Sequence, residues 1–337
     1  MLGLIIAVVV GSTILGHTPI GSATREPVKP RLLLADPSAP ATIVDPDVSR
    51  PDPFVMWDPV VQRFRMYTTN AQLLHVPMWL SDKVTGPWER AGEGLPVLPD
   101  WASDDFRVWA PEVAFINGLW TMWGSAGVKD TPSLCLFRAT AAAPAGPFVV
   151  DGAPPRLCDI SAGGTIDSHM TQDEAGTWWL SFKPNLNVYG VRTRLDSVQL
   201  DADGLPTGPV RTLIEASEPW MHDMIESPSF VKDPERNQWW LFFSAGFFAG
   251  ETPNYRIAGV PCDEPRGPCS VQGLVTLVVT NNQGTGPGEL SAFTDRDGAI
   301  WMSYNPAAPF VPTVRPLAVV RLAFDDAGVP YVARSDQ

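Results

Sequence analysis

Charged residues are scarce in this chain, at 18% of 337 residues, and cysteine and tyrosine are rare, with four and five copies. A long amphipathic helical pattern is also absent after residue 23. Proline (35) and glycine (28) instead make up close to a fifth of the residues, which excludes a helical bundle. A hydrophobic content of 45% excludes a disordered chain and is enough for a large core.

Basic residues are in the minority, with 24 Lys and Arg against 37 Asp and Glu, a net charge of −13 and a pI near 4.7. An acidic surface disfavours nucleic acid and anionic membranes as partners. Nothing in the sequence indicates an obligate protein partner. The 13 tryptophans fit two roles equally well, filling the core or stacking on sugar rings.

The first 23 residues contain no Lys, Arg, Asp or Glu and begin with the apolar run 2–10. This run is short for a membrane span, and Gly21-Ser22-Ala23 resembles a small-x-small cleavage site. We therefore predict a signal peptide over residues 1–23 and a secreted or cell-envelope protein. The missing positive charge near the N-terminus leaves an uncleaved anchor as the alternative.

The four cysteines fit an exported protein, because an even number in an oxidising compartment indicates disulfides. Cys262 and Cys269 bracket a turn-rich loop, so we predict that they pair, which leaves Cys135 with Cys158. Three pairings are possible in all. A zinc site is the alternative, but no histidine lies beside these cysteines at ligand spacing.

One pattern recurs five times along the chain: a carboxylate opens an apolar strand, and a turn leads to a second strand rich in aromatics. The five carboxylates are Asp52, Glu112, Asp167, Glu226 and Glu289. The aligned aromatics, 56 to 61 residues apart, are Tyr67, Trp123, Phe182, Phe243 and Tyr304. A unit of this length with four short strands is typical of a propeller blade. We predict an all-β, five-bladed β-propeller over residues 40–335; a β-sandwich would not explain the recurring carboxylate.

The innermost strand of each blade lines the central channel, so the five carboxylates should converge at one end of it. Crowded acids repel each other, and we expect at least one to have a raised pKa and to hold a proton near neutrality. A protonated acid facing an ionised one is the apparatus of glycoside hydrolysis. The alternative is a ring of solvated or cation-binding carboxylates, which could include a structural Ca²⁺ in the channel.

Four motifs carry a family resemblance, one in each of the first four blades. They are Arg50-Pro51-Asp52-Pro53, Trp109-Ala110-Pro111-Glu112, Gly164-Thr165-Ile166-Asp167 and Ile225-Glu226-Ser227-Pro228. Together they resemble the blade-opening motifs of the arabinanases and xylosidases of glycoside hydrolase family 43, which are five-bladed and inverting. The overall layout is also similar, more loosely, to the endo-D-arabinanases of family 183.

The resemblance to family 43 implies roles for three residues: Asp52 as general base, Asp167 as the group that tunes pKa, and Glu226 as general acid. We expect Asp167 to raise the pKa of Glu226 by repulsion. The chain departs from the family pattern at Ser227, where Gly or Ala is usual, and at Ser168, where the family has Pro. Glu112 stands where the family more often has Asp.

Substrate-binding roles are predicted for six further residues. Trp109 and Trp220 are candidate platforms for sugar stacking, and Glu112 and Glu289 are acids of the funnel. Strand alternation would place His169 on the same face as Asp167, where it could bind a hydroxyl or a metal, and His222 should lie on the rim.

The sequence therefore predicts an exported glycosidase that cleaves arabinofuranosyl linkages of a polysaccharide, with inversion and with no required cofactor. Its substrate would be arabinan, including the D-arabinan of mycobacterial arabinogalactan. The alternative function is a carbohydrate-binding propeller without catalysis. The presence of all three expected acids favours the enzyme.

Overall fold

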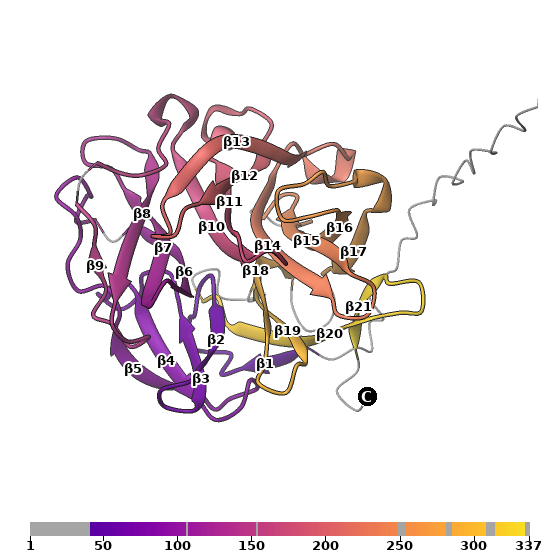
Figure 1. The fold of residues 1–337 in the computed structure, drawn as a ribbon, viewed down its shortest axis with the longest axis horizontal. Coiled ribbons are helices and arrows are strands. Elements are labelled where there is room, and N and C mark those ends of the chain that lie inside the picture. Colours follow the sequence, from indigo (N-terminus) through magenta and orange to yellow (C-terminus); the bar gives the residue numbers. More distant parts are fainter. Residues whose placement is uncertain are drawn as a thin grey trace, which may run out of the picture.

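The structure is a computed structural model that describes residues 41–105, 107–152, 154–248, 254–280, 285–307 and 314–333. The predicted signal segment 1–23 lies outside the described residues. Five antiparallel sheets stand around a central axis (Figure 1). This arrangement confirms the predicted five-bladed β-propeller.

Each blade is built from consecutive strands that run outward from the axis, and the first four blades have four strands each. In chain order the blades contain β2 (Phe54–Asp58), β3 (Arg63–Tyr67), β4 (Pro77–Ser81) and β5 (Glu89–Glu93); β6 (Val108–Ile116), β7 (Leu119–Gly127), β8 (Leu134–Ala141) and β9 (Val149–Val150); β10 (Thr165–Gln172), β11 (Trp178–Pro184), β12 (Arg194–Leu200) and β13 (Pro206–Glu215); β14 (Ile225–Asp233), β15 (Gln238–Ala245), β16 (Arg256–Cys262) and β17 (Val275–Val278); β18 (Thr285–Thr294), β19 (Ile300–Ala307), β20 (Leu317–Phe324) and β21 (Pro330–Ala333).

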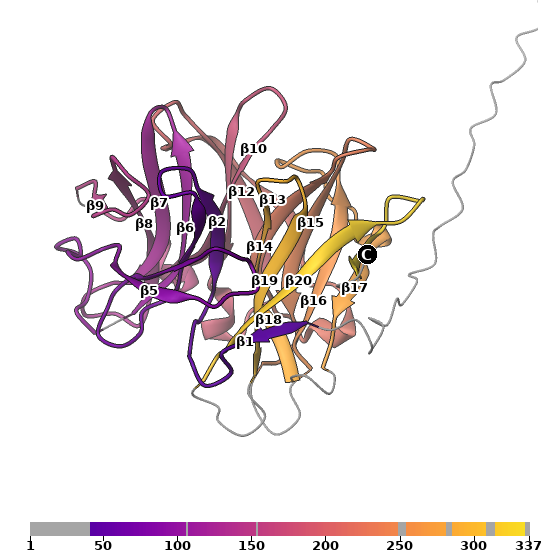
Figure 2. The same cartoon turned by 90° about the horizontal axis from the view of Figure 1, so that it is seen from below.

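The ring is closed by the strand that comes first in the chain. Strand β1 (Thr42–Val44) does not join the first blade but pairs antiparallel with β20 of the last one, with Thr42 opposite Val319. Strand β21 pairs with the other half of β20. The fifth sheet therefore contains strands from both ends of the described chain, and Figure 2 shows the indigo β1 among the orange and yellow strands of the last blade.

Hydrophobic cores fill the spaces between neighbouring blades. Five clusters of buried residues each combine side chains of two adjacent blades. The five aligned aromatics are all buried in these cores. Two pairs of adjacent tryptophans occur in the chain, Trp178-Trp179 and Trp239-Trp240. Trp179, Trp239 and Trp240 are buried, so three of these four side chains pack in the core.

Both predicted disulfides are present, Cys135–Cys158 and Cys262–Cys269. Helical structure in the described chain is limited to four short 3₁₀ turns, η1 (Ile160–Ala162), η2 (Leu186–Tyr189), η3 (Pro219–Met221) and η4 (Val271–Gly273). None of these described helices is long and apolar enough to cross a membrane.

Candidate active site

Each blade carries a left-handed backbone residue at the same point, where its innermost strand begins. These residues are Asp52 (φ 50°), Ala110 (φ 44°), Asp167 (φ 56°), Ser227 (φ 55°) and Glu289 (φ 54°). Positive φ is uncommon outside glycine and costs about 1–3 kcal/mol per residue. The pairing of the inner strand is irregular at this point in β6, β10, β14 and β18, as in a β-bulge. The strain therefore recurs in all five blades at one end of the channel.

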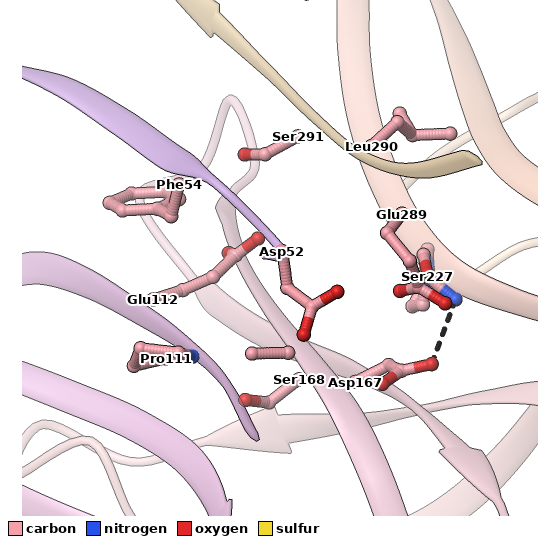
Figure 3. A pocket seen from close by; sticks show the side chains of 12 residues that line it. Asp52, Phe54, Pro111, Glu112, Asp167, Ser168, Ser227, Glu289, Leu290 and Ser291 are labelled. Carbon is pink, nitrogen blue, oxygen red and sulfur yellow. Dashed lines mark hydrogen bonds between the residues drawn. The ribbon is translucent and has the colours of Figure 1, made fainter. Parts of the chain in front are cut away.

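The five left-handed residues all line one pocket (Figure 3), whose open space, solvent at its mouth included, is about 310 Å³. Every blade contributes to its lining: Asp52 and Phe54; Ala110, Pro111 and Glu112; Asp167 and Ser168; Ser227 and Pro228; Glu289, Leu290 and Ser291. The carboxylates of Asp52, Glu112, Asp167 and Glu289 thus share one cavity, as predicted.

The predicted register of the carboxylates is wrong for two of the five. Asp52, Asp167 and Glu289 occupy the left-handed position itself, whereas Glu112 stands two residues after it and Glu226 one residue before it. Glu226 is consequently not among the residues that line the pocket. The bulge explains the error, because it shifts the alternation of side chains within the strand.

Glu226 is held in a buried ion pair. Its Oε2 lies 2.6 Å from Nζ of Lys183, and the side chains of Lys183 and Glu226 are 1% and 8% exposed. The Tyr255 hydroxyl lies 2.6 Å from the other oxygen, Oε1. Burial alone would raise the pKa of Glu226, but the Lys183 charge and the hydrogen bonds from Lys183 and Tyr255 outweigh it, and the pKa is lowered.

This direction corrects the expectation that Asp167 raises the pKa of Glu226. The pKa is instead raised at Asp167 and Glu289. Burial, followed by repulsion from Glu226, raises the pKa of Asp167 to about 7. Burial, followed by repulsion from Glu226 and Asp167, raises the pKa of Glu289 well above its usual value. The raised pKa values of Asp167 and Glu289 agree with the prediction that at least one acid holds a proton near neutrality.

Asp52 faces a cation and a hydroxyl. Arg315 donates to its Oδ1 and Thr69 Oγ1 donates to its Oδ2. Its backbone N–H donates to Asn305 Oδ1 at 2.8 Å, and the Asn305 amide in turn donates to three backbone carbonyls around the junction of the first and last blades. These contacts fix the carboxylate in position.

Glu112 and His169 form a buried pair across the second and third blades. His169 Nε2 accepts the Phe230 N–H at 2.9 Å, so the ring carries its proton on Nδ1 and donates it to Glu112 Oε2 at 2.9 Å. Both ring nitrogens are thereby engaged within the protein. A register shift lies between Ile166 and His169, but both Asp167 and His169 accept backbone N–H groups of β14, from Ser227 and Phe230. The predicted role of His169 in binding a hydroxyl or a metal stays a prediction.

Four of the predicted binding residues do not line the pocket: Trp109, His169, Trp220 and His222. The Trp220 ring is covered by Arg256, whose guanidinium carbon lies 4.5 Å from the ring centroid. His222 is exposed and ends the η3 turn in the left-handed conformation. Two aromatic side chains that follow β15 in the same blade as Arg256 are exposed instead, Phe247 and Phe248, at 53% and 59%.

Phe248 also connects the surface to the carboxylates, since its ring packs edge-on against Tyr255 with centroids 6.0 Å apart. The sequence reasoning missed Phe248, Tyr255, Lys183 and Arg315. The one signal for Lys183 is a lone cation directly after the buried residues Ser181 and Phe182 of the second strand. Such an isolated cation in an apolar strand indicates a buried anionic partner.

The residues of the described chain do not fit a metal site. No group of three or more His, Cys, Asp or Glu side chains there is arranged to hold an ion. The carboxylates next to the pocket face the protein's own cations, Lys183 and Arg315. The Ca²⁺ considered from the sequence stays an untested prediction, and no step below depends on it.

The chain matches the model of the glycosyl hydrolases family 43 over residues 47–330. A curated relative, the probable arabinan endo-1,5-alpha-L-arabinosidase A of Emericella nidulans, is 24% identical over 237 residues, which are 64% of this chain and 70% of the relative.

Solved structures share the fold over most of their length. A thermostable family-43 glycoside hydrolase superposes with a TM-score of 0.72 at 24% identity, covering 88% of this chain and 98% of that protein. The alpha-L-arabinanase of Cellvibrio cellulosa, solved with arabinohexaose, gives a TM-score of 0.68 at 19% identity, covering 85% and 96%.

Proposed function

The chain belongs to glycosyl hydrolase family 43 and is a glycosidase, and we propose that it cleaves arabinofuranosyl linkages within arabinan-type polysaccharides, with inversion at the anomeric carbon. The observation that carries this proposal is the pocket on which five blades converge, with Asp52 held beside a cation and Asp167 and Glu289 disposed to keep a proton. The names of the curated relative and of the Cellvibrio structure support the choice of sugar.

In this mechanism Asp52 is the general base. Arg315 and Thr69 hold its carboxylate at the edge of the cavity, where it accepts a proton from the attacking water. Glu226 protonates the leaving oxygen. Asp167 binds the backbone N–H of Ser227, the residue after Glu226, at 3.1 Å and so positions the acid.

Substrate binding follows from the contacts of the cavity. Glu112 has one oxygen bonded to His169, and its other oxygen is available to a sugar hydroxyl within the pocket. We assign sugar stacking to Phe248 in place of Trp220, because Phe248 is exposed and packs against Tyr255, whereas Arg256 covers the Trp220 ring. Trp109 and His222 keep at most a supporting role.

We also propose that the protein acts outside the cytoplasm or in the cell envelope. The uncharged apolar residues 1–23 and the two disulfides support this location. The natural substrate would then be a wall or matrix polysaccharide, either plant-type L-arabinan or the D-arabinan of mycobacterial arabinogalactan.

The test is to incubate the purified protein with each of these two polymers and with a xylan, and to identify the released sugars by chromatography and mass spectrometry. Release of arabino-oligosaccharides from one arabinan supports the proposal and assigns the D or L configuration. Release of sugars from xylan alone would show that the substrate is xylan and not arabinan. The Asp52→Asn variant serves as the inactive control.

A further inference from the structure

Tyr255 connects two acids that differ in their role. Its hydroxyl oxygen lies 2.6 Å from Oε1 of Glu226 and 3.0 Å from Oε1 of Glu289. Glu226 and Tyr255 are buried and Glu289 is partly buried, and the three side chains come from the fourth and fifth blades. A phenol has one proton to donate and lone pairs to accept another, so Tyr255 cannot donate to both carboxylates at once.

The proton positions that satisfy every contact follow from the neighbours. Glu226 is ion-paired to Lys183 and therefore accepts the Tyr255 proton. Glu289 must then carry its own proton and donate it to the Tyr255 oxygen. Its second oxygen, Oε2, accepts from Ser227 Oγ, which agrees with a proton on Oε1. The raised pKa of Glu289 fits this arrangement.

We propose that Glu289 and Tyr255 form a relay that supplies the proton which Glu226 delivers to the leaving sugar. The proposal rests on the glycosidase mechanism given above. It also answers a question that this mechanism leaves open: Glu226, paired with a buried lysine, does not hold the proton it must donate.

The transfer is balanced and needs no further reactant. The O–H bond of Glu289 breaks as its proton passes to the Tyr255 oxygen, the Tyr255 O–H proton passes to Oε1 of Glu226, and Glu226 protonates the glycosidic oxygen as the C–O bond breaks. Because the departing alkoxide is far more basic than a carboxylate, the net transfer from Glu289 to the sugar is favourable. Glu289 then regains a proton from solvent through the pocket that it lines.

Glu289 and Tyr255 act on the substrate only through Glu226. Their test therefore needs readouts beyond loss of rate, which a purely structural role could also cause. The charged and titratable groups that face Glu289 are Glu226, Asp167, Asp52, Arg315, Tyr255 and Lys183. Substituting Glu289 or Tyr255 leaves the acid Glu226, the base Asp52 and the cations Lys183 and Arg315 in place.

The experiment compares Tyr255→Phe, Glu289→Gln and the double variant on arabinan and on aryl arabinofuranosides with a 4-nitrophenol leaving group. Tyr67→Phe is the matched control, because Tyr67 is a buried tyrosine whose hydroxyl donates to Pro144 O in the core between the first two blades. On arabinan, each relay variant should lower kcat/KM about 10- to 100-fold, and the double variant should lose no more than the worse single variant. On the aryl substrate the change should stay below about threefold, since the leaving group barely needs a proton.

The pH profile gives a second readout. The relay works only while Glu289 is protonated, so activity falls as pH rises through the pKa of Glu289. In Glu289→Gln the proton must be held by Glu226 itself, whose pKa is lower, and the alkaline limb on arabinan should move down by at least about one pH unit. Equal losses on both substrates, additive losses in the double variant or an unmoved limb would each overturn the relay.

A measurement without substrate separates this proposal from the proposed function. Asp167 loses its proton as pH rises through about 7, and a second infrared carbonyl band of a protonated carboxylic acid, which titrates separately from Asp167, should be present in the wild type and absent from Glu289→Gln. Persistence of that band in the variant refutes Glu289 as the store of the proton. A wild type that releases nothing from either arabinan refutes the proposed function, while the infrared result still decides where the proton lies.

Discussion

The substitution Asp167→Asn should stabilise the fold in a pH-dependent way. The pKa of Asp167 is raised to about 7 in the folded protein by burial and by the Glu226 charge. An unfolded aspartate titrates near 3.9. The folded state therefore holds a proton that the unfolded chain releases, so the contribution of this carboxyl to stability is present at low pH and is lost as pH rises through about 7.

The magnitude follows from the two pKa values. At 1.36 kcal/mol per pH unit, ionised Asp167 costs the folded state about 4 kcal/mol well above pH 7, and about 2–3 kcal/mol of this cost develops between about pH 5 and pH 8. Asparagine keeps the oxygen that accepts the Ser227 N–H but has no charge. The stability difference between Asp167→Asn and the wild type should thus grow by about 2–3 kcal/mol over this pH range.

Urea denaturation at several pH values, with reversibility checked at each, measures this difference. Asp104→Asn, at an exposed carboxyl in the loop before β6, is the matched control and should show no such trend. Activity of Asp167→Asn should fall even as stability rises. A stability difference that does not change with pH, or that favours the wild type at pH 8, would refute the assignment of a buried, proton-binding Asp167.

Three further predictions concern catalysis and stability. Glu226→Gln should lower kcat on arabinan by at least about 10³-fold, with partial rescue on an activated aryl glycoside, and a near-normal rate on polymer would contradict its role as acid. Reduction of Cys135–Cys158 and Cys262–Cys269 should lower the free energy of unfolding by roughly 2–4 kcal/mol with activity retained, as denaturation with and without reductant can measure. The first product should have the inverted anomeric configuration by NMR, because Asp52 activates water; a sugar ester trapped on Asp52 would show a nucleophile instead.

The propeller could be predicted from the sequence because its repeat is carried by local patterns. Turns, apolar strands and one aromatic per blade recur about every 60 residues, and each blade packs mainly against its two neighbours. The disulfide pairs could also be predicted, since Cys262 and Cys269 lie on either side of one short loop. The role of β1 could not be predicted, because a three-residue strand that joins the last blade has no sequence pattern of its own.

The contacts that set the charge of the site lie beyond such patterns. Lys183 is 43 residues from Glu226, and Tyr255 is 29 residues from Glu226 and 34 from Glu289. Nothing local in the sequence pairs these positions. The four acids that line the pocket were nevertheless recognised, because each stands within four residues of the first residue of an inner strand.

The irregular start of the inner strands explains why the side chains that face the pocket were only partly predicted. A period of two assigns side chains to faces only while the pleat is regular, and here all five inner strands begin with a left-handed residue that is not glycine. Asp, Ala, Asp, Ser and Glu share no sequence signature for that conformation. The same distortion sends Asp52, Asp167 and Glu289 into the pocket, turns Glu112 and His169 toward each other, and leaves Glu226 beside Lys183. Five carboxylates that look equivalent along the chain thereby acquire different neighbours: Arg315 for Asp52, Lys183 and Tyr255 for Glu226, His169 for Glu112, and other acids for Asp167 and Glu289.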